Sequence, residues 1–288
     1  MRKTPMALSL TRQRRRLRLF STAAFTLALM LGTHARAQTP VANDSTTEYT
    51  PTVGQLGKDV VWVPTADSLV AHMLDMAAIT PQDYLVDLGS GDGRTVIAAA
   101  KRGTRAHGIE YNPDLVKLSQ EAAKKAGVTD LATFVEGDIF KSDFSDATVV
   151  TLFLLPELNL RLRPILLNMK PGTRVVSNSF MMDDWEPDES IETDLNCKSY
   201  CNAYKWVVPA KVDGSWELGN NATLRLKQTF QKLEGHYALN GKRHEIYNAG
   251  MQGANITFTA NGQQYTGTVN GNQINGKDSA GKEWSARR

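Results

Sequence analysis

The segment VDLGSGDGR, residues 86–94, constrains the fold of this chain more than any other. An apolar run ends in Asp87, three glycines alternate with Ser90 and Asp92, and an apolar helical pattern begins at Arg94. This order is typical of a buried strand, a tight loop and a helix. The glycines let a ligand approach the backbone, and the helix directs its positive end at the same place. The segment therefore predicts an α/β fold with a ligand site after this strand.

Strand-like and helix-like patterns alternate along residues 84–180. The expected strands are residues 84–89, 105–110, 132–138, 147–155 and 173–180, and the expected helices are residues 94–103, 113–127 and 156–172. Pro164 is expected to break or kink the last of these helices. Strands that are apolar on both faces and separated by helices predict a mostly parallel sheet.

A further helix is expected before the first strand. Thr65 or Asp67 is expected to cap it, since both side chains accept hydrogen bonds at helix starts. The residues that share its apolar face are Leu69, Met73, Met76 and Ala77. This face predicts a helix packed on the sheet.

The pattern changes after about residue 185. Residues 181–190 read as an acidic loop, and residues 203–218 as two strands joined by a turn at Gly214. From residue 222 onward short alternating segments are separated by Asn-Gly pairs at 240–241, 261–262, 270–271 and 275–276. Because Asn-Gly favours two-residue hairpins, this region predicts an antiparallel β meander or small barrel.

Residues 1–37 have the composition of an export signal. They hold eight Lys or Arg and no acid, an apolar stretch at residues 19–31 and small residues at Ala35 and Ala37, so cleavage is expected before Gln38. The apolar stretch is too short to span a bilayer, so no stable membrane span is expected after cleavage. Removing these residues leaves 25 basic and 30 acidic residues, a net charge of −5. The expected location is the periplasm, and no nucleic-acid partner is expected.

The only two cysteines, Cys197 and Cys201, lie close together in the sequence. An exported protein meets an oxidising compartment, so a small-loop disulfide is one expectation and two free thiols are the alternative. No group of residues has the spacing of a metal site, so no metal is expected.

Acidic residues follow three successive strands of the expected sheet. Asp87, Glu110 and Asp138 all fall at the carboxyl edge, where open α/β sheets bind ligands. Acids at this loop oppose an anionic dinucleotide but suit S-adenosylmethionine, which carries no phosphate and has a cationic amino-acid end. Asp87 is expected to face the ammonium group, Glu110 the ribose hydroxyls and Asp138 the adenine amine. The predicted cofactor-binding residues are Asp87, Gly89, Ser90, Gly91, Gly93, Glu110, Tyr111, Asp138 and Ile139.

The motifs VDLGSGDGR, GIEYNPDLV, EGDIF and PGTRVVSNSF resemble those of the class I methyltransferases. The segments VPTADSLVAHMLDMA, TLFLLPELNLRLRP and DDWEPD are similar to a bacterial group related to the ATP synthase c-subunit lysine methyltransferases and, more distantly, to the non-SET histone lysine methyltransferases. The resemblance implies a Rossmann-like seven-stranded sheet and S-adenosylmethionine. The expected organisation is a signal peptide at 1–37, a flexible segment at 38–57, a methyltransferase domain at 58–218 and the antiparallel β region at 222–288.

The element after the fourth strand is expected to line the acceptor pocket. There Pro156, Glu157 and Asn159 adjoin an apolar slot that suits a lysine stem, with Glu157 near the amine. Trp185, which lies among acids, is either a cover for a cationic substrate by cation–π contact or a surface lid residue. The resemblance also implies a lysine acceptor.

Three functions are compatible with these features. The first is an exported methyltransferase acting on a protein lysine or another amine. The second is a catalytically silent methyltransferase fold retained as a binding or scaffold protein of the cell envelope. The third is a small-molecule amine methyltransferase, for which the acidic charge of the mature chain would attract cationic acceptors.

Overall fold

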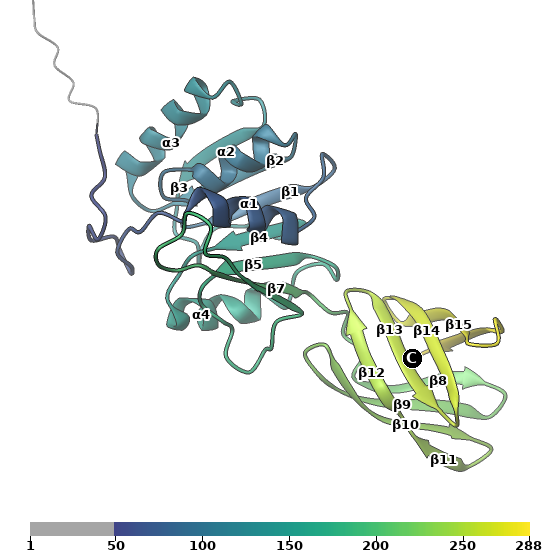
Figure 1. Ribbon diagram of the computed structural model, residues 1–288. Helices are drawn as coiled ribbons and strands as arrows, with labels where there is room; N and C mark the ends of the chain where they lie inside the picture. Colours follow the sequence, from purple (N-terminus) through teal and green to yellow (C-terminus); the bar gives the residue numbers. More distant parts are fainter. Residues whose placement is uncertain (1–48) are drawn as a thin grey trace, which may run out of the picture. The chain divides into compact units, whose positions relative to one another are not determined.

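A computed structural model describes residues 49–288, which form four helices and two β-sheets (Figure 1). The predicted signal peptide and residues 38–48 lie outside the described residues. The helices are α1 (Asp67–Met76), α2 (Arg94–Lys101), α3 (Pro113–Lys125) and α4 (Pro156–Leu166). The strands of the first sheet are β1 (Tyr84–Leu88), β2 (Arg105–Glu110), β3 (Ala132–Glu136), β4 (Val149–Leu152), β5 (Arg174–Asn178), β6 (Glu189–Glu192) and β7 (Asn202–Val207).

The first sheet has seven strands in the order β3-β2-β1-β4-β5-β7-β6, as the resemblance implied. Strands β1 to β5 are parallel, and β7 runs antiparallel between β5 and β6. Successive residues of β1 enter different cores: Leu85 packs with side chains of α1 and α2, whereas Val86 packs with those of α4. The apolar runs read from the sequence therefore bury both faces of this sheet.

Three local expectations for this domain were wrong. Helix α4 is not broken at Pro164, which lies near its end, where a missing N–H costs a single hydrogen bond. The N-cap of α1 is Ala66, and no side chain caps this helix. Residues 189–192 form the edge strand β6 instead of a loop, because pairing with β7 satisfies their backbone groups.

Two strands expected to form one hairpin belong to different sheets. Strand β7 pairs with β5, whereas β8 (Gly214–Gly219) pairs with β9 (Ala222–Thr229) and β16 (Glu283–Arg287). The second sheet therefore begins earlier than residue 222. Its other strands are β10 (Lys232–Leu239), β11 (Lys242–Glu245), β12 (Tyr247–Gln252), β13 (Asn255–Ala260), β14 (Gln263–Asn270) and β15 (Gln273–Asp278).

The second sheet has nine antiparallel strands and closes into a barrel, because β9 pairs with β10 as well as with β8. Its own core is built around Trp216, Phe258 and Ile256. Asn-Gly pairs 240–241 and 261–262 form turns with positive φ at both residues. The pair 275–276 instead lies inside β15, where a Cβ on Gly276 would come within 1.9 Å of the Thr266 carbonyl oxygen. None of the described helices has the length and apolar character needed to cross a membrane.

Candidate active site

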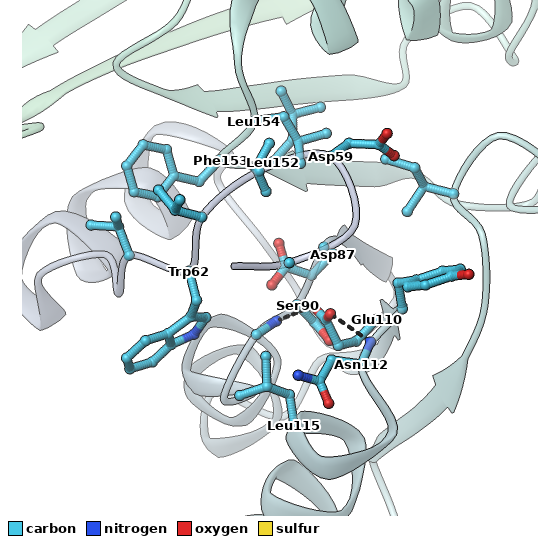
Figure 2. A pocket seen from close by; sticks show the side chains of 18 of the residues that line it. Asp59, Trp62, Asp87, Ser90, Glu110, Asn112, Leu115, Leu152, Phe153 and Leu154 are labelled. Carbon is cyan, nitrogen blue, oxygen red and sulfur yellow. Dashed lines mark hydrogen bonds between the residues drawn. The ribbon is translucent and has the colours of Figure 1, made fainter. Parts of the chain in front are cut away.

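A cavity lies at the carboxyl ends of β1, β2 and β4 (Figure 2). This is the sheet edge at which open α/β folds bind ligands. Of the twelve residues that the sequence analysis singled out for cofactor or acceptor, those that line the cavity are Asp87, Gly89, Ser90, Gly91, Glu110, Tyr111, Asp138 and Ile139.

The glycine loop between β1 and α2 bends back toward the sheet. Gly89, Gly91 and Gly93 all have positive φ, which a side chain rarely adopts. A Cβ on Gly91 would come within 2.8 Å of the Trp62 indole nitrogen. Gly93 does not line the cavity, because it begins α2 and packs so tightly that a Cβ would meet the Phe134 ring at 2.7 Å. The third glycine thus serves helix packing, and its predicted contact with a ligand stays a prediction.

Asp87 is a buried carboxylate that lines the cavity from β1 (Figure 2). Burial raises its pKa to about 7, and the nearby carboxylates Glu110 and Asp92 act in the same direction. The Thr151 hydroxyl donates a hydrogen bond of 2.6 Å to one oxygen, which opposes the rise in pKa. Because a carboxylate has about four acceptor sites, Asp87 retains sites for a cationic ligand group.

Glu110 closes the glycine loop onto the end of β2. One carboxylate oxygen accepts from the Gly91 N–H at 2.9 Å and the other from the Asn112 N–H at 3.0 Å. These bonds fix the orientation of the side chain before any ligand binds, and each oxygen retains one further acceptor site. Tyr111, the next residue, is half exposed at the same rim.

Asp138 lies two residues beyond the end of β3, in the turn that follows this strand. One oxygen accepts from the Lys58 ammonium at 2.8 Å and the other from the Phe140 N–H at 3.0 Å. The hydrogen bond from Lys58, together with that of Phe140, holds the pKa of Asp138 below its ordinary value. An adenine amine would share this carboxylate with Lys58.

Residues 55–65 form a cover for the cavity that the sequence analysis missed. The Gly54 N–H donates to the Trp62 carbonyl and the Trp62 N–H to the Gln55 carbonyl, so this part of the segment expected to be flexible is a hydrogen-bonded turn. Its end is tied to α2, because the Arg94 guanidinium donates to the Thr65 carbonyl at 2.7 Å. Polar composition alone does not distinguish such a turn from a flexible terminus, because contacts with residues distant in the sequence, such as Arg94, hold the turn in place.

The predicted acceptor residues Pro156, Glu157 and Asn159 do not line the cavity. Pro156 and Glu157 are exposed at the start of α4. Asn159 is fully buried, and its amide donates to the Phe180 and Met181 carbonyls at 3.2 and 3.3 Å. It therefore holds the chain after β5 in place.

Trp185 neither covers the cavity nor forms a surface lid. It is fully buried, and its ring packs beside that of Trp206, whose indole N–H donates to the Trp185 carbonyl. The acidic neighbours in the sequence gave no sign of this burial, because the backbone turns the Trp185 side chain inward from an exposed segment.

Apolar side chains form the remaining side of the cavity. They come from the end of β4 and the start of α4, from Phe180 after β5, and from Tyr200 before β7. Tyr200 lies within a loop closed by a Cys197–Cys201 disulfide, which agrees with the first of the two expectations for these cysteines. Phe153 and Leu154 are seen at this side in Figure 2.

This arrangement fits S-adenosylmethionine on the chemistry of its donor and acceptor set. Asp87 supplies a buried negative charge for an ammonium group, and Glu110 supplies acceptors for hydroxyl groups. The backbone N–H groups of the glycine loop and the apolar side chains of the rim surround the space between Asp87 and Glu110.

Comparison with known proteins agrees with this geometry. The family described as ANTKMT methyltransferase domain matches residues 87–189, which end before the second sheet begins. A protein-lysine N-methyltransferase of Saccharolobus islandicus (strain REY15A) is 43% identical over 138 residues, covering 47% of this chain and 86% of that protein.

A second curated relative is matched over a shorter share of its length, and a solved structure over nearly all of its chain. The human ATP synthase c-subunit lysine N-methyltransferase is 42% identical over 137 residues, and the chain spans 58% of that protein. A crystal structure of an RNA methyltransferase from Salinibacter ruber in complex with S-adenosyl-L-homocysteine is 47% identical and covers 52% of this chain and 96% of that one, with a TM-score of 0.49. From the family match and the archaeal relative, the chain belongs to the S-adenosylmethionine-dependent methyltransferases, in the family that contains the protein-lysine N-methyltransferases.

Proposed function

We propose that this methyltransferase transfers a methyl group to the side-chain amine of a protein lysine. The cavity carries this proposal: carboxylates lie at one end and apolar side chains from β4 and α4 at the other. An apolar passage suits the aliphatic stem of lysine, and the carboxylates attract its charge. The archaeal and human relatives, both lysine N-methyltransferases by name, support the same acceptor.

The reaction requires alignment of two reactants and exclusion of water. When bound, S-adenosylmethionine would supply a sulfonium methyl group. In-line attack of a neutral amine on the methyl carbon would form the N–C bond, break the C–S bond and leave S-adenosylhomocysteine, and the nitrogen would then lose a proton to solvent. Asp87 and Glu110 would hold the cofactor at the sheet edge. The cover at residues 55–65 and the residues after β4 line other sides of the cavity, where they would limit the access of water.

We further propose that the protein acts outside the cytoplasm, with residues 1–37 removed as a signal peptide. The charge and apolar pattern of these residues support export. The proposed organisation is then the methyltransferase domain followed by the β-barrel. An exported enzyme would meet acceptor proteins of the cell envelope.

Two measurements on the protein starting at Gln38 test this function. Isothermal titration with S-adenosylmethionine measures cofactor binding in the wild type and in Asp87→Ala, Glu110→Ala and Glu121→Ala. Glu121 lies on the exposed side of α3 and serves as the matched control. We expect binding to weaken in the first two variants and to stay unchanged in the third. Undiminished binding in both Asp87→Ala and Glu110→Ala would refute the cofactor assignment.

Incubation of envelope extract with the protein starting at Gln38 and tritiated S-adenosylmethionine then identifies the acceptor class. We expect labelled protein that releases methylated lysine on acid hydrolysis. If only small molecules are labelled, the acceptor is a small amine and not a protein lysine. Absence of label from a protein that binds the cofactor would favour the scaffold function.

A further inference from the structure

Three aromatic rings form one side of the cavity. Phe153 follows β4, Phe180 follows β5, and Tyr200 lies just before β7. Their ring centroids are 5.2 to 6.2 Å apart, so each ring contacts the other two. We call these three residues the aromatic wall. They come from distant parts of the sequence, and no motif predicted that they meet.

Separate contacts hold each part of the wall. Asn159 binds the Phe180 carbonyl, and the Ser179 N–H donates to the Asn202 carbonyl at 2.8 Å, which joins the segments carrying Phe180 and Tyr200. The Cys197–Cys201 disulfide closes the loop that presents Tyr200. Tyr200, which is 45% exposed, is thus held at the cavity by the disulfide and by hydrogen bonds of the neighbouring segments.

The charges around the cavity favour a cation on this wall. The carboxylates that line it are Asp59, Asp87, Asp92, Glu110 and Asp138. Its two described cationic side chains pair with two of these carboxylates, Lys58 with Asp138 and Arg94 with Asp92, so the lining keeps a surplus of carboxylates. Aromatic faces attract ammonium groups, and more strongly so when the cation is desolvated.

A planar base is a poorer match for the same surface. The Phe153 and Phe180 rings contact each other, which leaves no slot between them for a third ring, and Tyr200 is inclined by 62° to Phe153. Such inclined faces suit the rounded head and flexible stem of an alkylammonium chain.

We propose that the aromatic wall binds the alkylammonium arm of the acceptor, with the stem packed on the rings and the nitrogen directed at the cofactor. This inference rests on the proposed lysine methylation and assigns its acceptor subsite to Phe153, Phe180 and Tyr200. It replaces Pro156, Glu157 and Asn159 in that role.

Cofactor analogues with different arms test the subsite directly. In the probes, a tertiary amine replaces the cofactor sulfur and carries a methyl, a heptyl or a 2-(butylamino)ethyl group. In the 2-(butylamino)ethyl group, the secondary ammonium takes the place of the acceptor nitrogen, and the butyl chain corresponds to the four-carbon stem of lysine. The heptyl group has the same chain length without the charge. Isothermal titration on the protein starting at Gln38 gives the affinity of each.

We expect the butylaminoethyl probe to bind about tenfold more tightly than the methyl probe, with heptyl in between. We call the ratio of the affinity of a longer probe to that of the methyl probe its gain. In Tyr200→Leu and Phe180→Leu the gain of the butylaminoethyl probe should fall to about threefold or less. The methyl probe should keep its affinity in these variants, which would show that the cofactor site is folded. Tyr200→Phe should retain the gain. Tyr247→Leu changes a comparably exposed ring on β12, outside the cavity, and should behave as the wild type.

The outcomes separate the two proposals. If the methyl probe and S-adenosylhomocysteine both fail to bind, the proposed function itself fails. If the methyl probe binds but the arm adds nothing, or if Tyr200→Leu and Phe180→Leu keep the full gain, the aromatic wall is not the acceptor subsite. A heptyl gain equal to the butylaminoethyl gain would overturn a cationic acceptor.

Discussion

At the scale of single residues, burial sets the chemistry of the site. Asp87 would be an ordinary carboxylate in an unfolded chain, but desolvation in the sheet raises its pKa to about 7. Asp138 lies at the same edge with its pKa lowered by Lys58, so two carboxylates of one cavity titrate in different ranges. The residue type was evident from the sequence, whereas the pKa depends on the neighbours that folding supplies.

The pKa of Asp87 predicts a pH dependence of cofactor binding. Only the ionised carboxylate attracts the ammonium group, so wild-type affinity should fall by up to about tenfold per pH unit as the pH drops below 7. Asp87→Asn should bind about tenfold more weakly at pH 8 and lose this dependence, because it has no charge to titrate. Isothermal titration between pH 5.5 and 8 measures both effects. An unchanged pH profile in the variant would contradict this role.

The glycine loop gives a prediction about stability. Gly93→Ala places a Cβ within 2.8 Å of both the Phe134 ring and Ser119, in addition to the strain of a positive φ. We expect it to lower the free energy of unfolding by about 3 kcal/mol. Gly127→Ala has a similar φ but no atom within 4 Å of the new Cβ, so about 1 kcal/mol is expected. Urea denaturation of both variants measures the difference, and equal losses would show that packing at Gly93 is not limiting.

At the scale of elements, side chains on α4 position the strand ends that form the cavity. The sequence correctly placed a helix after β4, but the residues of that helix predicted to adjoin the apolar slot do not line the cavity. The rotation of α4 decides this: Leu158 faces the cavity, whereas Asn159 points into the protein toward the chain after β5. Helical periodicity indicates which residues share a face, and only packing decides what that face meets.

The role of Asn159 is open to a direct test. Asn159→Leu keeps the branching and the number of side-chain heavy atoms but removes the donors to the Phe180 and Met181 carbonyls, so we expect a loss of about 2 kcal/mol in the free energy of unfolding. Glu157→Gln, two residues away and exposed, should change it by less than about 0.5 kcal/mol. Chemical denaturation of both variants provides the comparison. A stable Asn159→Leu variant with impaired methyl transfer would instead support direct contact with the acceptor.

At the scale of the whole molecule, each sheet has its own cluster of buried residues, and Phe230, in the turn between β9 and β10, packs on the cluster of the first sheet. The residues that fill the barrel, such as Trp216 and Phe258, belong to neither of the cores that pack on the first sheet. The family match also ends at residue 189, before the barrel. The ligand cavity is lined by residues up to Tyr200 and by none of the barrel strands.

Separate cores predict separable effects of mutation. Phe258→Ala should remove about 3 to 5 kcal/mol from the stability of the barrel. The affinity for S-adenosylhomocysteine should remain unchanged, because the cavity shares no core residue with the barrel. Calorimetry with and without S-adenosylhomocysteine measures both quantities. Loss of cofactor binding in this variant would show that the barrel supports the site.

The sequence pattern by itself predicted the mostly parallel sheet, the glycine loop and the placement of Asp87, Glu110 and Asp138 at one edge, because the carboxyl ends of successive parallel strands meet there. The seven-stranded type of the sheet was implied only by the resemblance to the class I methyltransferases. The tertiary structure alone decided that residues 55–65 cover the cavity, that Trp185 is buried and that Phe153, Phe180 and Tyr200 form one wall. Those contacts join segments far apart in the chain, and no local pattern encodes which side chains will face each other there.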